Sequence, residues 1–307
     1  MKPPCGLFDR LLVATAIAEQ MTLITDDENI ERYDVFQKEI KDMRWALILG
    51  ASSGFGEAAA LALAGGGFNI IGVHLDRRST LANAERIVGE IHGMGREALF
   101  FNVNAADHDR RAEVINACKD KICLVSATNG IRVFLHSLAF GTLKPYIADD
   151  KKSAVKPADM DMTLDVMAHS FVFWTQDLFT AGLLTKGARL FAMSSAGSRR
   201  VWPSYGPVSA AKAALEAHVR QLAVELAPHG ISVNAIQAGV ADTPAARRIP
   251  GSEQMFDKAA GMNPGGRLTR PEDVAKIIAA LAACESSDAA SWMTGNVIRI
   301  DGGEDIV

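Results

Sequence analysis

A glycine-rich turn directly behind a short apolar run is the feature that most constrains the fold of this chain. Residues 46–56 read ALILGASSGFG, with Gly50, Gly54 and Gly56 following the apolar run and a helix-forming segment behind them. Glycines in such a turn let the backbone bend tightly and approach a pyrophosphate, which then lies on the free N–H groups at the start of the helix. Three glycines alone are weak evidence for such a binding site. A strand before them and a helix after them indicate a dinucleotide-binding site.

From Arg44 onward, apolar runs of strand length alternate with helix-length periodic segments, which is typical of βαβ units and a parallel sheet. The predicted strands are 46–49, 70–75, 97–101, 133–138, 189–194, 232–237 and 297–300. The predicted helices are 57–64, 81–92, 110–118, 162–178, 208–226 and 271–284. These elements predict an α/β fold of the Rossmann type, with one doubly wound sheet of seven parallel strands. Two segments, 141–161 and 239–269, are predicted as long irregular loops, which in compact domains usually carry function.

Composition excludes several classes of protein. The 307 residues are 49% hydrophobic, enough for a large core, and the net charge of −4 argues against nucleic acid as the main partner. No apolar run reaches the roughly 18 residues of a membrane span, and acids interrupt the N-terminus where a signal peptide needs an apolar stretch. We therefore expect a cytoplasmic protein. The four cysteines are scattered without metal-site spacing, so no metal site is predicted. They are Cys5, Cys118, Cys123 and Cys284.

The end of the second predicted strand bears on the choice of dinucleotide. An acid there accepts hydrogen bonds from a ribose 2′-hydroxyl, whereas a 2′-phosphate needs cations. His74 stands where the acid is expected, and Arg77 and Arg78 follow it, so the sequence favours NADPH over NADH. Asp76 supports the alternative, because a small shift of the loop would place it on the ribose. The two arginines also fit a solvated helix start.

Residues 44–303 resemble the short-chain dehydrogenase/reductase family. The likeness rests on the glycine turn, FNV at 101–103, SSAG at 194–197, a tyrosine and a lysine at a helix start, VNAIQAG at 233–239 and IRIDGG at 298–303. In most of the family a tyrosine lies four residues before the lysine and a serine lies thirteen before the tyrosine. Here Ser195 keeps its register with Lys212, but Val208 occupies the usual tyrosine position. Tyr205 lies three residues earlier, about one helical turn.

The resulting Tyr-x6-Lys spacing resembles the enoyl-acyl-carrier-protein reductases, a divergent branch of that family. VFLHSLAFG at 133–141, LDVMAHSFVF at 164–173 and GVADTPAARRIPG at 239–251 also resemble segments of this branch. Residues 194–205 and 212–243 look closest to its NADPH-using type. Carbonyl-reducing relatives commonly carry an active-site asparagine on the central helix, where this chain has Met167 or a neighbour.

The substrates offer a physical reason for the shifted tyrosine. Reduction of a ketone requires the phenol to protonate the oxygen next to the carbon that receives hydride. Reduction of a conjugated enoyl thioester delivers hydride to C3, and negative charge develops on the more distant thioester oxygen. The resemblance implies that Tyr205 donates a hydrogen bond to this enolate and that Lys212 holds the nicotinamide ribose. Ser195 or Ser194 either bonds the substrate oxygen or satisfies backbone groups at the strand end.

The resemblance also implies where the cofactor and partners bind. The predicted cofactor-binding residues are Gly50, Ser52, Ser53, Gly54, Phe55, Gly56, His74, Arg77, Arg78, Asn102, Val103, Ser137, Leu138, Ala139, Ser194, Lys212, Gly239, Ala241 and Thr243. The segment 239–269 resembles a substrate lid, and a homotetramer is implied. The basic lid residues fit either docking of an acidic acyl carrier protein or a solvated loop. They are Arg247, Arg248, Lys258 and Arg267.

The N-terminal residues do not belong to this pattern. Residues 8–35 resemble the C-terminal part of PIN-domain ribonucleases, with Asp9 and Asp27 at two of their metal-binding positions. Such a site needs several clustered carboxylates, and the elements that would bring the others are absent. We expect a non-catalytic extension over 1–43 and a reductase domain over 44–307.

The leading hypothesis is NADPH-dependent reduction of the C2=C3 double bond of an enoyl thioester in fatty-acid synthesis. A first alternative is a carbonyl reductase of the same family, acting on a 3-ketoacyl, steroid or sugar-like substrate. A second alternative is a catalytically silent NADP(H)-binding module that senses cofactor or acts as a scaffold.

Overall fold

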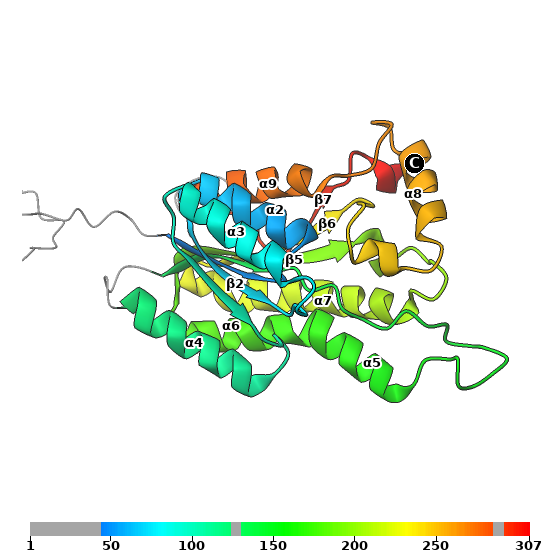
Figure 1. Cartoon of the computed structure of the whole chain (residues 1–307), viewed down its shortest axis with the longest axis horizontal. Helices are drawn as coiled ribbons and strands as arrows, with labels where there is room; N and C mark the ends of the chain where they lie inside the picture. Colours follow the sequence, from blue (N-terminus) through cyan, green and yellow to red (C-terminus); the bar gives the residue numbers. More distant parts are fainter. Residues whose placement is uncertain (1–43, 124–129, 285–291) are drawn as a thin grey trace, which may run out of the picture. The chain divides into compact units, whose positions relative to one another are not determined.

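The computed structural model describes residues 44–123, 130–284 and 292–307, all of which belong to one compact unit, Arg44–Val307 (Figure 1). The predicted extension over 1–43, with its resemblance to a PIN domain, lies outside the described residues. Within the described part of the chain, no helix is long and apolar enough to cross a membrane.

A parallel sheet of seven strands forms the centre of this unit, in the order β3-β2-β1-β4-β5-β6-β7. The strands are β1 Trp45–Leu49, β2 Asn69–His74, β3 Ala98–Asn102, β4 Ile131–His136, β5 Leu184–Ser195, β6 Ser232–Ala238 and β7 Val297–Ile300. The order runs outward in both directions from the β1–β4 pair, which confirms the predicted doubly wound Rossmann-type sheet. In such sheets the ligand crevice lies outside the carboxyl ends of the strands at this switch point.

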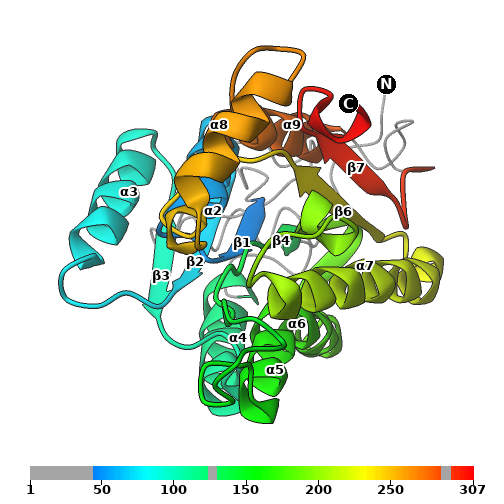
Figure 2. The same ribbon diagram turned by 90° about the vertical axis from the view of Figure 1, so that its right-hand side faces the viewer.

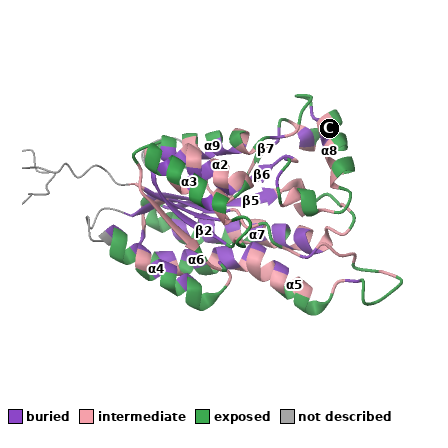
Figure 3. Ribbon diagram, in the orientation of Figure 1, coloured by how far each residue is buried: buried purple, intermediate pink, exposed green. Residues whose placement is uncertain are grey.

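Helices cover both faces of the sheet. Figure 2 shows α2 (Gly54–Gly65), α3 (Leu81–Gly93) and α9 (Pro271–Ala283) on one side and α4 (His108–Cys123), α6 (Ser170–Thr180) and α7 (Gly206–Leu226) on the other. Side chains alternate along β1: Trp45, Leu47 and Leu49 join the apolar cluster with α4, α6 and α7, whereas Ala46 and Ile48 join the cluster with α2, α3 and α9. Because both faces are covered, the inner strands are buried along their length (Figure 3).

Two predicted elements are wrong in extent. The predicted helix 162–178 instead begins as α5 at Pro157–Leu164, passes through a π-helical turn at Asp165–His169 and continues as α6. Proline suits the first helical position because its missing N–H has no partner there, and the sequence prediction overlooked this start. The predicted loop 239–269 contains a helix, α8 (Ser252–Met262), in which Ala259 is the one buried residue. Its apolar residues Met255, Phe256, Ala259 and Met262 recur at helical spacing, so an amphipathic pattern was present and the sequence prediction overlooked it.

Candidate active site

The glycine turn brings the start of α2 against the ends of β1 and β4. A Cβ atom on Gly56 would lie 2.0 Å from the carbonyl oxygen of Gly50, and one on Gly50 would lie 2.6 Å from that of Ser137. Gly50 also has φ of +83°, a conformation that favours glycine. From the far side of the site, the Thr243 methyl group approaches Gly54, at 3.4 Å from a Cβ placed there. The glycines therefore let α2 begin directly against the strand ends, and this cradle of backbone at a helix N-terminus fits a dinucleotide pyrophosphate.

The structure gathers most of the predicted cofactor-binding residues at one edge of the sheet, the carboxyl ends of its strands (Figure 2). Those at strand ends or directly behind them are Gly50, Ser52, Ser53, Gly54, Phe55, Gly56, His74, Arg77, Arg78, Asn102, Val103, Ser137, Leu138, Ala139, Ser194, Gly239, Ala241 and Thr243. Phe55 differs from the others because its side chain packs against the apolar cluster beneath α2. Lys212 comes to this edge from α7.

At the end of β2, His74 is buried and its Nδ1 atom lies 2.7 Å from the carboxylate of Asp76. Asn102, at the end of β3, accepts a hydrogen bond from the Asp76 backbone N–H at 2.9 Å. Burial raises the pKa of Asp76, but hydrogen bonds from Ser52, the nearby Thr80 and His74 outweigh it and leave the pKa below its ordinary value. The carboxylate therefore stays ionised beside the glycine turn. Arg77 and Arg78 are exposed just beyond it.

Ser195 and Tyr205 border one small space. Ser195 is the last residue of β5, and Tyr205 directly precedes the first residue of α7. A Cβ on Gly197 would lie 2.6 Å from the Tyr205 ring and 3.1 Å from the Ser195 hydroxyl, so a glycine is needed between them. The buried Ser195 hydroxyl has no partner in standard hydrogen-bond geometry. Burial raises the pKa of Tyr205, and the nearby serine hydroxyl offsets this in part, so the phenol keeps its proton at neutral pH.

Lys212 is buried in α7, with 5% of its surface exposed, and its Nζ atom donates to the Met193 carbonyl at 2.6 Å. Burial lowers the pKa of Lys212 to about 8, while Glu216, one turn further along the helix, acts in the opposite direction. Glu216 in turn accepts a hydrogen bond from the Ser194 hydroxyl at 2.5 Å. The sequence analysis missed Glu216, although its i,i+4 spacing from the lysine was available as a signal.

His136, at the end of β4, is a second residue that the sequence analysis missed. Its side chain is fully buried, and its Nε2 atom lies 2.8 Å from the Ser170 hydroxyl, which donates to the Val166 carbonyl at 2.8 Å. The serine oxygen therefore accepts a hydrogen bond from the Nε2–H group, which fixes a neutral tautomer. Burial and the nearby Lys212 lower the pKa of His136 to about 3. The ring stays uncharged at neutral pH.

A valine occupies the position that holds a tyrosine in most of the family, and the side chains around it are also apolar. Val208 is 4% exposed and forms a small cluster with Met167 and Ala211, against which the Tyr205 side chain packs. Met167 lies in the π-helical turn, a feature that is frequent at functional sites. Beside the phenol, this chain thus offers aliphatic groups and a thioether where the carbonyl-reducing pattern has an amide.

Charges on the segment 239–269 are partly neutralised. Arg247 forms two hydrogen bonds of 2.6 Å with the Asp242 carboxylate, and Arg267 pairs with Asp273 at 2.6 Å. Arg248 and Lys258 are exposed. This pairing weakens the interpretation of the segment as a basic docking surface.

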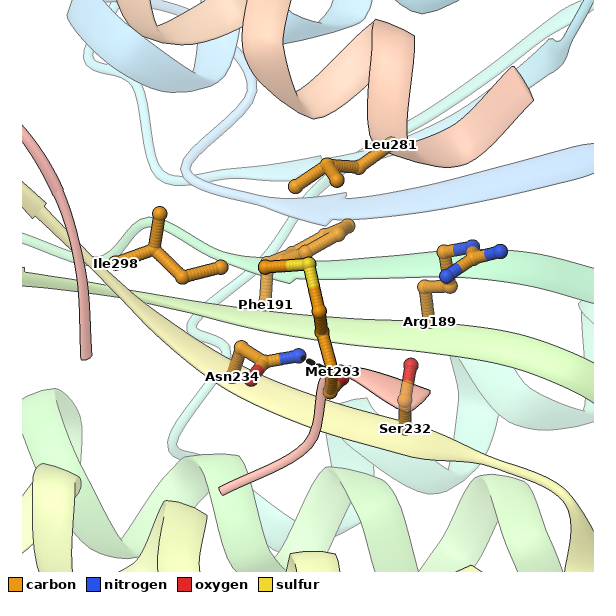
Figure 4. Close-up of a pocket in the computed structure, with 7 residues that line it drawn as sticks. All are labelled: Arg189, Phe191, Ser232, Asn234, Leu281, Met293 and Ile298. Carbon is orange, nitrogen blue, oxygen red and sulfur yellow. Dashed lines mark hydrogen bonds between the residues drawn. The ribbon is translucent and has the colours of Figure 1, made fainter. Parts of the chain in front are cut away.

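The pocket in Figure 4 lies away from this site. It is lined by Arg189, Phe191, Ser232, Asn234, Leu281, Met293 and Ile298. Arg189 pairs in register with Ser232, the first residue of β6, so the pocket lies near the start of that strand and not at its carboxyl end. The Asn234 amide donates to the Met293 carbonyl at 2.7 Å and closes one side.

A test of the cradle is the variant Gly56→Ala. The added methyl group would collide with the Gly50 carbonyl, so we expect dinucleotide affinity, measured by NADPH fluorescence titration, to fall at least about tenfold. Gly65→Ala in the same helix is the control, because nothing lies within 4 Å of the new methyl group. That variant should bind normally and gain up to about 1 kcal/mol in unfolding free energy. Equal binding by both variants would contradict the assignment.

The pKa of Lys212 predicts how dinucleotide binding depends on pH. Below a pH of about 8 the ammonium is present in the free protein; raising the pH removes it, so affinity should decline by at most about tenfold per pH unit. Lys212→Met should bind weakly with no such decline. Titrations between pH 6.5 and 9.5 make the comparison, and a Lys212→Met variant that binds as tightly as the wild type at pH 6.5 would rule out a role for this charge in binding.

Comparison with known proteins agrees with this geometry. The family model described as "Enoyl-(Acyl carrier protein) reductase" matches residues 50–304, and a model described as "NAD(P)H binding domain of trans-2-enoyl-CoA reductase" matches residues 13–81. The 1-cyclohexenylcarbonyl-CoA reductase of Streptomyces collinus is 29% identical over 88% of this chain and 90% of that enzyme. The NADH-dependent enoyl-[acyl-carrier-protein] reductase FabI of Buchnera aphidicola is 33% identical over 56% of this chain and 64% of that enzyme.

A solved structure of a 3-oxoacyl-[acyl-carrier protein] reductase from Brucella melitensis, in complex with NAD, superposes with a TM-score of 0.72. It is 25% identical, with 87% of this chain and 99% of that chain covered. The relatives thus include reductases of enoyl and of 3-oxoacyl groups. The chain belongs to the short-chain dehydrogenase/reductase family of NAD(P)H-dependent oxidoreductases, on the enoyl reductase-like branch that the matching model describes.

Proposed function

We propose that this protein reduces the C2=C3 double bond of an enoyl thioester with NADPH. The observation that carries the proposal is the placement of the phenol. Tyr205 precedes α7, while Val208, at the usual tyrosine position, is buried among apolar side chains. A phenol set back by about one helical turn suits an oxygen several ångströms from the carbon that receives hydride.

The residues of the site divide the chemistry among them. Bound nicotinamide would supply the hydride that C3 receives. Tyr205 keeps its proton because burial raises its pKa, and it donates a hydrogen bond to the thioester oxygen as negative charge develops there. Ser195, with its buried hydroxyl beside the phenol, is placed to donate to the same oxygen. A proton taken up from solvent then adds to C2 of the enolate and completes the reduction.

Lys212 supplies positive charge beneath the site. Its ammonium would hold the nicotinamide ribose and reduce the free-energy cost of the developing enolate. His136 is neutral at neutral pH and contributes no competing charge. Glu216 favours the protonated lysine. These assignments make the lysine a fixed cation at neutral pH.

The surroundings of Tyr205 suit an acyl chain. Leu143, Leu164 and Val166 pack against the cluster of Met167, Val208 and Ala211, so the side chains around the phenol are mainly hydrocarbon. By resemblance we place the reaction in fatty-acid synthesis, in the cytoplasm, with the protein acting as a homotetramer. An acidic acyl carrier protein is the proposed carrier, with coenzyme A as its alternative.

A carbonyl reductase is the second candidate. It is favoured by the short separation of the Ser195 hydroxyl and the Tyr205 ring, which both lie against Gly197, and by the relative that reduces 3-oxoacyl groups. It would require Tyr205 to reach an oxygen bonded directly to the carbon that receives hydride. Apolar Met167 offers no amide to a proton relay in that reaction.

For the cofactor we favour NADPH. Asp76, the residue that would bind a ribose 2′-hydroxyl, already interacts with His74. Arg77 and Arg78 follow it at the surface, where a 2′-phosphate would meet them.

The first test follows NADPH consumption with crotonyl and acetoacetyl thioesters, each in carrier-protein and coenzyme A forms. We expect turnover of the crotonyl substrate, and Tyr205→Phe should lower kcat by about 100-fold or more, because it removes a donor to the developing oxyanion. Dinucleotide affinity of the variant serves as the control and should be unchanged. Turnover of acetoacetyl thioester alone would establish the carbonyl reductase, and binding without any turnover would favour the silent module.

A second test separates the two dinucleotides. The double variant Arg77→Ala/Arg78→Ala should raise KM for NADPH about tenfold or more and leave KM for NADH unchanged, because a charge-assisted hydrogen bond contributes about 1.5–3 kcal/mol. Asp76→Asn is the matched variant and should affect NADH alone. If the arginine variant changes neither constant while Asp76→Asn impairs NADH, the enzyme uses NADH.

A further inference from the structure

The segment 196–205 joins Ser195 to Tyr205 and ends in an unusual backbone conformation. Ser204, directly before the phenol-bearing residue, has φ of +61°, and no other non-glycine residue in the described part of the chain has a positive φ. Side chains other than hydrogen disfavour this conformation, which persists only where the surroundings over-determine it. The contacts that hold this segment therefore matter for the direction of Tyr205.

One carboxylate ties the middle of the segment to the C-terminus. Asp305 accepts a hydrogen bond from the Arg199 Nη2 atom at 2.6 Å and forms an ion pair with the Arg200 Nε atom at 2.9 Å. The side chain of Asp305 is 8% exposed, and its carboxylate also accepts from the Gln237 amide of β6 at 3.0 Å. Gln237 pairs in register with Ser194. Asp305 therefore connects the segment to the strand beside the catalytic serine.

A second contact ties the segment to residues 239–269. The Trp202 indole donates to the Pro250 carbonyl at 3.1 Å, and the Tyr205 N–H closes a turn onto the Trp202 carbonyl at 3.1 Å. The arginines and the tryptophan therefore hold the chain up to the first residue of the turn that contains Ser204.

The C-terminal turn is itself held at the carboxyl edge of the sheet, at the same end of the molecule as α8 in Figures 1 and 2. Glu304 accepts the Val240 N–H at 3.0 Å, and the Asn263 amide donates to the Asp301 carbonyl at 2.8 Å. The Asp305 N–H bonds the Asp301 carboxylate at 3.2 Å. These hydrogen bonds hold the C-terminal turn in place, so the carboxylate of Asp305 has a defined position when it pairs with the two arginines.

We propose that Asp305 is a positioning residue for Tyr205. Through Arg199 and Arg200 it holds the segment 196–205 in the geometry that aims the phenol at the substrate oxygen. The inference rests on the function proposed above and adds a residue to it. Both arginines are about half exposed, at 50% and 44%, so the pairs contribute little to global stability. Their effect is on the placement of one loop, and small displacements of reacting groups have large effects on rate.

The test compares Asp305→Asn with Arg299→Gln. Arg299 lies in β7 with its Nε atom 3.5 Å from the same carboxylate, so its variant disturbs Asp305 without touching the segment 196–205. We expect Asp305→Asn to lower kcat for crotonyl thioester about 10- to 100-fold, with KM for NADPH changed less than about twofold. Arg299→Gln should retain the wild-type kcat.

The ionisation of the phenol provides a readout that overall stability does not move. An ultraviolet difference titration against Tyr205→Phe gives the pKa of Tyr205, which burial holds above its ordinary value. In Asp305→Asn the loosened loop should admit water and lower this pKa toward its ordinary value, whereas Arg299→Gln should leave it in place. If Asp305→Asn does not fold, the double variant Arg199→Gln/Arg200→Gln removes the same contacts from exposed positions.

Two results would overturn the inference: wild-type kcat and phenol pKa in Asp305→Asn, or an equal loss in Arg299→Gln. Failure of the proposed function has a different signature. In that case the wild-type protein does not turn over crotonyl thioester, while the pKa comparison still reports whether Asp305 places the phenol.

Discussion

The close approach of Gly56 to the Gly50 carbonyl is the constraint on which the rest of the site depends. It lets α2 begin directly over the end of β1, and the contact of Gly50 with the Ser137 carbonyl brings the end of β4 to the same point. These are the two strands at which the sheet reverses its winding. A side chain at either glycine would push the helix away from the sheet and close the crevice that a dinucleotide needs.

Burial sets the charge of three side chains around that crevice. It lowers the pKa of Lys212 to about 8 and that of His136 to about 3, and it raises that of Tyr205. At neutral pH the lysine is thus the cation among these three groups, with a neutral imidazole and a protonated phenol near it. This arrangement suits stabilisation of one developing negative charge, because the donor and the cation are in place before the charge forms.

Sequence reasoning predicted the parts of this structure that local patterns encode. The seven strands, the glycine turn and the helix carrying Lys212 follow from apolar runs, turn residues and helical periodicity. The π-helical turn at Asp165–His169 could not be predicted in this way. A single π-helical turn shifts the apolar pattern of the surrounding helix by one residue, which is too little to recognise in a sequence. Helix α8 could have been predicted, because Met255, Phe256 and Ala259 recur at helical spacing, but the segment was predicted as a loop.

The missed site residues share a different physical cause. The role of His136 depends on Ser170, 34 positions later, and the pairing of Asp305 with Arg199 spans 106 positions. Contacts at such separations arise from the order of strands in the sheet, so they become visible when the elements are placed in space. Glu216 is the exception, because it lies one turn from Lys212 on the same helix.

The displaced tyrosine changes how the catalytic geometry is held. In the family's usual pattern the tyrosine and the lysine are four residues apart on one helix, so the helix itself keeps them on the same face. Here the phenol belongs to the N-cap residue of α7, whose carbonyl accepts the first helical hydrogen bond, from the Ser209 N–H at 2.9 Å. The helix therefore holds Tyr205 from one side only, and the preceding segment holds it from the other, with Ser204 in a left-handed conformation and contacts to Pro250 and Asp305. A phenol that reaches a more distant oxygen thus depends on anchors outside the helix, which links the chemistry of Tyr205 to the last residues of the chain.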